Sequence, residues 1–186
     1  MRYIFLSIML IFFNGCNLKL MENAPKEDYY ILDYSGDKKC LDNSEKTLLF
    51  IDNIKASSEV DTRFVNIKNG YKYDKINGIK FAALPSEMAR KAIFKAFYSS
   101  CKIEPKLVMK NGAYIFKSEI LTLQIDKSRN VAIFEMMYSV DKETKSLFSD
   151  IKRSEVGISG DNIMDAINKA MSITLDAILD DIENKF

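Results

Sequence analysis

The stretch VAIFEMMYSV, Val131–Val140, decides the fold. Every second residue in it is apolar, and alternate residues of a strand lie on the same face. The apolar positions of that face are Ala132, Phe134, Met136, Tyr138 and Val140. Successive side chains of a strand point to opposite faces. The spacing therefore predicts a strand that buries one face in a core.

The segments on either side of this stretch also read as strands. Tyr114–Ile125 precedes it across the polar loop Asp126–Asn130, and Leu147–Val156 follows it after Asp141–Lys145. Strands joined by short polar connections pair antiparallel. The second half of the chain is therefore predicted to form an antiparallel meander.

Two Asn-Gly pairs predict hairpins, because Asn-Gly favours the positive φ angles of a type I′ turn. The first pair, Asn69-Gly70, joins Phe64–Ile67 to Tyr71–Tyr73. The second pair, Asn111-Gly112, joins Lys106–Lys110 to the strand that follows.

Two further strands and two helices complete the predicted elements. The strands are Tyr29–Asp33 and Lys46–Ile54. One helix, Pro85–Ser100, begins with a proline, which suits the first helical position, and a longer one begins near Asp161, a good N-cap. Both helices carry apolar stripes at helical spacing; the stripes are Ala89, Ala92, Ile93, Ala96 and Phe97, and Ile163, Ile167, Ala170, Met171, Leu175, Ile178 and Ile182.

These elements predict an α+β fold, a largely antiparallel sheet with two amphipathic helices packed mainly on one face. The acidic residues Asp180, Asp181 and Glu183 end the last helix. Negative charge is unfavourable at a helix C-terminus, so we expect that end to fray.

The N-terminus has the three parts of an export signal. Arg2 supplies a positive charge, Tyr3–Phe13 is an apolar run too short to span a membrane, and Asn14-Gly15-Cys16 is a small-residue exit. The sequence FNGC, Phe13–Cys16, resembles a bacterial lipobox, which implies diacylglycerol on the Cys16 thiol. The alternative is an ordinary cleaved signal that carries a cysteine. We predict a lipoprotein signal peptide at 1–15, a lipidated tether at 16–28 and one domain at 29–186.

Composition excludes several classes of function. The net charge of +1 gives no electrostatic reason to expect a nucleic-acid partner. The chain has no histidine, which removes the commonest catalytic base and metal ligand. Its seven glycines form no phosphate-binding loop. We expect no enzyme activity, no cofactor and no metal, since only a Ser-Lys hydrolase would survive these exclusions.

Two cysteines remain once Cys16 is acylated. Cys40 and Cys101 are a disulfide candidate in an oxidising compartment. The alternative is two free buried thiols, which behave as small hydrophobic side chains.

Several short motifs follow one another in an order typical of one family. The lipobox comes first, then Tyr29–Leu32, Arg63 through Tyr73, Phe81–Met88, Ala113–Phe116, and Ala166 and Ala170 of the last helix. In this order they resemble the auxiliary lipoproteins of ABC-type lipid transport systems that work with MCE (mammalian cell entry) proteins, including the paraquat-inducible system. The family usually has tryptophan where this chain has Phe81.

The resemblance implies a non-catalytic periplasmic domain, lipid-anchored in the outer membrane, that docks a membrane-bridging MCE protein during lipid transfer. Asn17 agrees with outer-membrane sorting, because it is not the aspartate that holds many lipoproteins at the inner membrane. The sequence leaves the oligomeric state open, a homo-oligomer included. The alternative function is a lipoprotein activator or assembly factor of a periplasmic cell-wall synthase or secretion channel.

The candidate partner interface is the segment around the first hairpin, with Phe64, Tyr71, Tyr73 and Phe81 as its aromatic residues. A hairpin at a sheet edge offers unpaired backbone groups to a partner. Tyrosine and phenylalanine are enriched in the cores of interfaces. Packing in this domain's own core is the alternative for these aromatics and for Tyr29 and Tyr30.

Replacement of the lipobox cysteine tests the anchor. Cys16→Ser is expected to abolish metabolic labelling with palmitate and to release the protein from the membrane fraction, because the acylated thiol is lost. Cys40→Ser serves as the control and should remain labelled. Persistent labelling of Cys16→Ser would contradict the lipoprotein prediction.

Overall fold

The computed structural model describes residues 26–36, 45–160 and 162–186. The predicted signal peptide 1–15, the lipidation site Cys16, most of the tether 16–28 and Cys40 lie outside these residues. No helix within the described ranges is long and apolar enough to cross a membrane.

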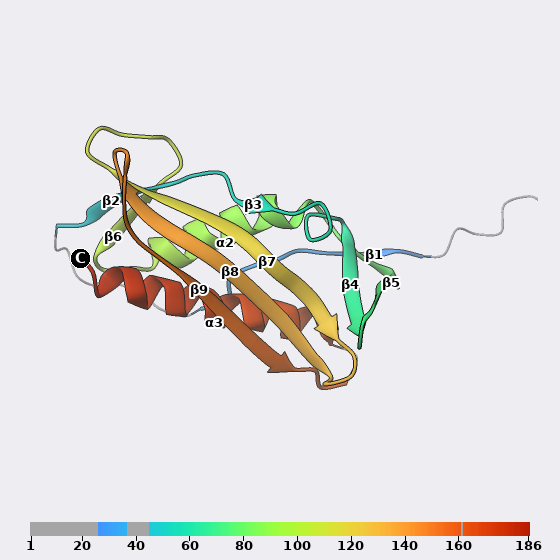
Figure 1. The fold of residues 1–186 in the computed structure, drawn as a ribbon. Coiled ribbons are helices and arrows are strands. Elements are labelled where there is room, and N and C mark those ends of the chain that lie inside the picture. The colour runs from blue at the N-terminus through green and yellow to red at the C-terminus, as the bar shows by residue number, and fades with distance from the viewer. Residues whose placement is uncertain (1–25, 37–44, 161) are drawn as a thin grey trace, which may run out of the picture.

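The sheet is built around one strand of thirteen residues, β7, Tyr114–Asp126. One edge of β7 pairs antiparallel with β8, Val131–Lys142. The other edge pairs in turn with three short parallel strands, β2 (Thr47–Ile51), β3 (Lys55–Ala56) and β4 (Phe64–Asn69). Figure 1 shows β7 running through the middle of the sheet, with these short strands along one side.

Four more strands extend the sheet outward. β9, Lys145–Gly157, pairs antiparallel with β8 and completes the predicted meander. β6, Ile103–Lys106, lies parallel to β2. β5, Lys72–Phe81, pairs antiparallel with β4, and β1, Asp28–Tyr30, lies parallel to β5. The α+β class is confirmed. Beside the long antiparallel strands β7, β8 and β9, the sheet also contains shorter strands that pair in parallel.

The predicted hairpin around Asn111-Gly112 is wrong. β6 ends at Lys106 and pairs with β2 through Phe50, so it makes no ladder with β7. The edge of β7 that it would need is already taken, because Leu49 of β2 lies opposite Tyr114. Gly112, with φ of 78°, still turns the chain into β7.

The first hairpin is confirmed, but its turn differs from the prediction. Asn69 pairs with Lys72, so the two turn residues are Gly70 and Tyr71. Gly70 has a φ of 60°, whereas Tyr71 stays at negative φ. That pattern belongs to a type II′ turn, in which glycine takes the first central position and a residue with a Cβ takes the second.

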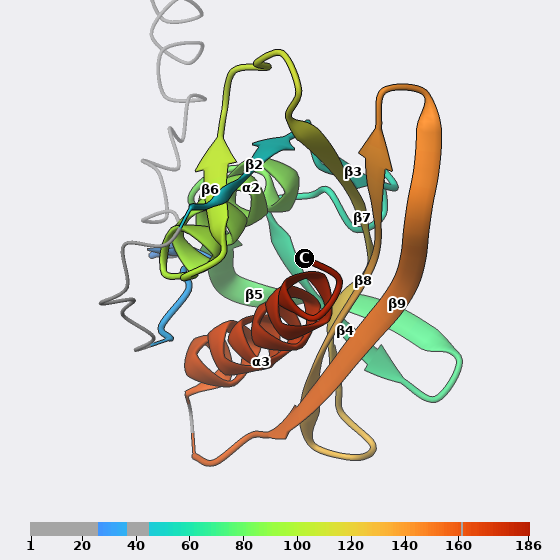
Figure 2. The same ribbon diagram turned by 90° about the vertical axis from the view of Figure 1, so that its left-hand side faces the viewer.

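Both helices lie on the same face of the sheet (Figure 2). α2, Pro85–Tyr98, buries its whole predicted stripe, and α3, Ile163–Glu183, buries its stripe from Ile167 to Ile182. α3 packs across β8 and β9. The predicted N-cap Asp161 lies outside the described residues; the residue before α3 is Asn162, whose side chain does not cap the helix.

The prediction that α3 frays at its C-terminus is wrong, because its carboxylates are held by the sheet and by α2. The Tyr138 hydroxyl donates to Asp181 at 2.8 Å, and Lys152 lies 2.5 Å from the same carboxylate. The Lys152 hydrogen bond holds the pKa of Asp181 below its usual value. The Ser100 hydroxyl donates to Glu183 at 2.5 Å, which joins the end of α2 to the end of α3.

The predicted strand Tyr29–Asp33 is shorter than expected because the chain leaves β5 and binds α3. The backbone N–H of Asp33 donates to Asn168 at 3.1 Å, and that of Ser35 donates to Ser172 at 3.2 Å. The buried Tyr34 donates its hydroxyl to Asp176 at 2.5 Å. The three α3 residues are spaced by four, so they form one polar line along the helix.

Two isoleucines of α3 test how much this packing contributes. Ile178 is fully buried, whereas Ile173 is 45% exposed on the same helix. Ile178→Ala is expected to lower the free energy of unfolding by about 2–5 kcal/mol, because it leaves a cavity against the sheet. Ile173→Ala should change it by about 0.5 kcal/mol or less in urea unfolding. Equal losses would contradict the packing described for α3.

Candidate functional site

The β4–β5 hairpin, predicted as a partner interface, projects from the side of the sheet (Figure 2). Tyr71 at its turn is fully exposed, and Tyr73 on β5 is 61% exposed. Phe64 at the start of β4 is partly buried. We call this region, with Tyr29 beside it, the hairpin surface.

Phe81 does not belong to the hairpin surface. Its side chain is 1% exposed and lies in the hydrophobic core. Its backbone fixes it there, because its N–H donates to the carbonyl of Arg63 at 2.7 Å and its own carbonyl accepts from the Arg63 guanidinium at 3.0 Å. The interface prediction is wrong for this residue, and the core alternative holds.

Each aromatic ring of the hairpin surface except Tyr71 has a cation over it. Phe64 lies between Lys75 and Lys80, whose amines are 4.1 and 5.1 Å from the ring centre. Lys68 lies over Tyr73 at 5.7 Å, and Arg63 lies over Tyr29 at 5.3 Å. Exposed contacts of this kind contribute about 0.5–1 kcal/mol each, so they hold the cations beside the rings.

Two acidic residues balance part of this positive charge, Glu27 and Asp74, and the carboxylate of Asp74 lies 3.9 Å from Lys72. Glu27 lies 2.5 Å from Lys80 and accepts from the Tyr29 hydroxyl at 2.9 Å. The hydrogen bond from Lys80 lowers the pKa of Glu27, so its carboxylate stays ionised at more acidic pH than an ordinary glutamate does. Lys68 and Lys75 make no such pair within the described residues, which leaves the hairpin surface positive.

The backbone of β5 adds a second means of recognition. β1 pairs with β5 only at Ile79–Phe81, so in the described part of the chain Lys72–Gly78 has a neighbouring strand on one side alone. Unpaired N–H and C=O groups at such an edge can accept an added strand. A hollow of about 450 Å³ beside Tyr73 and Lys75 extends to Leu121–Gln124 of β7.

The described side chains provide groups for binding rather than for acid–base chemistry. No group of three or more His, Cys, Asp or Glu side chains gathers to hold a metal ion within the described ranges. Burial raises the pKa of the Tyr34 and Tyr138 phenols, and both donate to carboxylates of α3. A phenol with a raised pKa is a poor nucleophile at neutral pH.

Sequence reasoning found the tyrosines of the hairpin surface but missed its cations. The pairing of the two hairpin strands could have predicted Lys68, because it lies directly opposite Tyr73 across the two-residue turn. Arg63 and Lys80 could not be found in this way. Their positions depend on β1, which brings Tyr29 and Glu27 against β5 from far away in the sequence.

The comparisons with known proteins identify the fold. No protein-family model and no curated protein matches this sequence. A crystal structure described as an uncharacterized protein superposes with a TM-score of 0.71 at 10% identity, covering 84% of this chain and 99% of that one. The crystal structure of XCC0632 from Xanthomonas campestris, described by the family name DUF330, has a TM-score of 0.64 at 14% identity and covers 82% of this chain and 92% of that one.

A third structure is similar over a smaller part of the chain. Hypothetical protein CT253 from Chlamydia trachomatis superposes with a TM-score of 0.50 at 9% identity, covering 76% of this chain and 95% of that one. Identities this low show a shared fold and nothing about function. The α+β arrangement is therefore found in other solved proteins of similar extent.

Cys101 lies directly after α2 and is disulfide-bonded. Its partner lies outside the described residues, because the other two cysteines of the chain, Cys16 and Cys40, both do. If Cys16 is acylated, Cys40 is the remaining partner, so the Cys40–Cys101 pair stays a prediction. Ser100 beside it is tied to Glu183, so this bond would fix the segment before β2 to the end of both helices.

Mass spectrometry of peptides from the unreduced mature protein tests the pairing. The expected result is a single cross-linked peptide containing Cys40 and Cys101, with neither thiol open to alkylation until reductant is added. A bond that closes the loop from Cys40 to Cys101 contributes on the order of 4 kcal/mol to stability in the chain-entropy model. Reduction should therefore also lower the melting temperature. Full alkylation of both thiols without reductant would contradict the pairing.

Proposed function

We propose that this protein is a lipid-anchored periplasmic subunit that docks the membrane-bridging MCE protein of an ABC-type lipid transport system at the outer membrane. Its role is to bind and position, with no catalysis of its own. The observation that carries the proposal is the hairpin surface. It combines exposed tyrosines, a net positive charge and a strand edge, Lys72–Gly78, that no other described strand pairs with, in one projecting element.

The exposed tyrosines support a protein partner. Tyr71 is fully exposed and Tyr73 is 61% exposed, so most of the surface of both rings remains available for burial by a partner. Tyrosine is among the residues that most often dominate the energy of binding interfaces. The cations beside them favour an acidic partner surface, which would speed encounter and select orientation.

The place of β1 supports a role close to a membrane. β1 fixes the N-terminal segment to β5, and the Glu27–Lys80 ion pair lies at the same point. The predicted tether 16–28 reaches at most about 40 Å when extended. A lipid on Cys16 would therefore keep β1, at the base of the hairpin surface, within that distance of the membrane.

Replacing the two exposed tyrosines tests the docking function. Tyr71→Ser with Tyr73→Ser should weaken co-purification with the MCE protein by about thirtyfold or more, since interface hot spots contribute at least about 2 kcal/mol. Cells carrying the double variant should become sensitive to detergent. The purified domain should remain folded with only a small fall in melting temperature, because Tyr71 is fully exposed and Tyr73 loses one exposed cation–π contact.

Ile151→Ser is a suitable control, because Ile151 is 50% exposed on β9, away from the hairpin surface. The control should keep the partner. A folded double variant that still binds the MCE protein would rule out this surface. Co-purification with a cell-wall synthase or a secretion channel, lost in the same variant, would favour the alternative function instead.

A further inference from the structure

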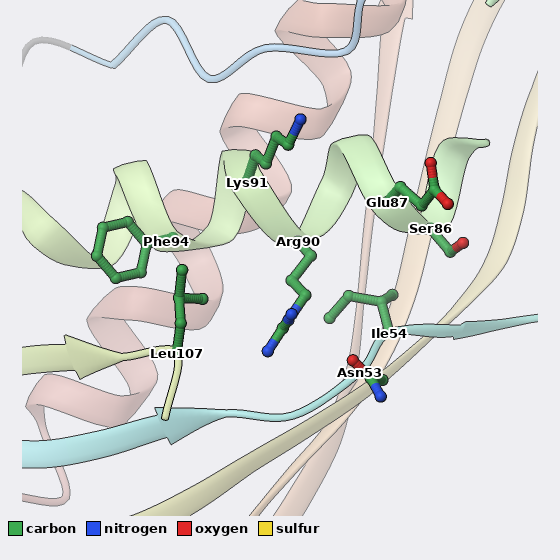
Figure 3. A pocket seen from close by; sticks show the side chains of 8 residues that line it. All are labelled: Asn53, Ile54, Ser86, Glu87, Arg90, Lys91, Phe94 and Leu107. Atoms are coloured by element: carbon green, nitrogen blue, oxygen red, sulfur yellow. The ribbon is translucent and has the colours of Figure 1, made fainter. Parts of the chain in front are cut away.

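A groove of about 600 Å³ runs between α2 and the segments that follow β2 and β6 (Figure 3). This volume lies within the range of small-molecule sites, about 300–1,000 Å³. Its apolar side is made by Phe94 of α2 and Leu107, and Ile54 lies deeper within it. The groove is formed without any residue of the hairpin surface.

Arg90 is the cation that points into this groove. Figure 3 shows its side chain extending from α2 toward the strand below, between Leu107 and Ile54, while Lys91 and Glu87 point away from it. One guanidinium nitrogen donates to the carbonyl of Ile51 at 3.1 Å. The Nε of Arg90 is buried and has no acceptor, and Arg90 forms no ion pair within the described residues.

A partly buried guanidinium without a counter-ion is unfavourable, because the charge loses hydration and gains no carboxylate in exchange. An anion in the groove would offset this desolvation cost through a charge-assisted hydrogen bond to Arg90, which is among the stronger polar contacts in proteins. The amide of Asn53, which also lines the groove, is a second polar group near the same place.

The apolar side of the groove continues onto an exposed loop. Leu107, Val108 and Met109 are 48%, 75% and 48% exposed, and they lie between Lys106 and Lys110. Three consecutive exposed apolar residues are unusual in a soluble domain unless they bind something. An aliphatic chain lying along Phe94 and this loop would remove that surface from water.

We propose that this groove binds a single anionic amphiphile, with its carboxylate or phosphate at Arg90 and its aliphatic chain along Phe94 and Leu107–Met109. Charge complementarity at Arg90 and the apolar strip beside it point to this occupant together. The inference goes beyond the docking function and does not rest on it, because each uses a different surface.

A fluorescence titration tests the proposal directly. The chain has no tryptophan, so Tyr98→Trp provides a single reporter beside the groove, where Tyr98 stacks on Phe94. The protein used is the chain from residue 16 with Cys16→Ser, which contains every described helix and strand. The probes are decyl phosphate and decanoate below their micelle concentrations, with decanol as the uncharged chain and inorganic phosphate as the headgroup alone.

Saturable binding of decyl phosphate or decanoate is expected, with decanol bound at least about tenfold more weakly. A preference for decyl phosphate would identify a phospholipid-like headgroup and a preference for decanoate a fatty acid; either result supports the proposal. Arg90→Gln should weaken binding of the anionic amphiphile about tenfold or more. Leu107→Ser should weaken it without changing stability, because Leu107 is exposed.

Matched controls are Arg153→Gln and Leu147→Ser, which remove an arginine and a similarly exposed leucine from β9 and should leave binding unchanged. If Arg90→Gln lowers the melting temperature, Leu107→Ser alone decides the outcome. Unchanged binding in folded Arg90→Gln or in Leu107→Ser would overturn the proposal. So would binding of inorganic phosphate as tight as that of decyl phosphate, because the aliphatic chain would then contribute nothing. Arg90→Gln should still co-purify with the MCE protein. If amphiphile binding is not found but this co-purification persists, the groove proposal fails and the docking function does not.

Discussion

The rest of the structure depends on the double pairing of β7. A strand buried in a sheet must satisfy the N–H and C=O groups of both edges. β7 pairs with β8 along one edge, and with β2, β3 and β4 at three separate points along the other. Each short strand therefore reaches the sheet at a fixed point of β7. The groove beside β2 and β6 lies toward one end of β7, and the hairpin lies toward the other.

The helices complete this arrangement by covering one face. α3 lies across β8 and β9, and its carboxylate Asp181 is bound by Tyr138 of β8 and Lys152 of β9. The polar line Asn168, Ser172 and Asp176 then holds the segment after β1. A pull on the N-terminus, as from a lipid anchor, would act first on β1 and this segment. The hairpin shares β5 with β1, so the N-terminal segment and the hairpin surface are linked through one strand.

The sequence predicted those elements whose signal is local. The alternation in Val131–Val140 and the stripes of both helices depend on residues a few positions apart, and the structure confirms them. The parallel pairs were missed because β2, β3 and β4 meet β7 only through long-range contacts. Phe81 was assigned to a surface for the same reason, since its position depends on hydrogen bonds with Arg63, which lies far from it in the sequence. Arg90, which forms no ion pair with any described residue, carries no signal in the sequence.

The hairpin surface and the groove are separate sites with different chemistry. The first presents aromatic rings and lysines on a projecting strand pair, which fits a protein. The second places one guanidinium beside an apolar strip, which fits an amphiphile. A lipid transport subunit would use the hairpin surface to bind its partner and the groove to bind a lipid.

Site-specific photo-cross-linking in cells tests the docking function most directly. A photoreactive residue replaces Tyr71 in one strain and Met137, which is 40% exposed on β8, in another. Docking predicts a cross-link from position 71 to the MCE protein and none from position 137. A cross-link from position 71 to a cell-wall synthase or secretion channel, or equal cross-links to the MCE protein from both positions, would contradict it.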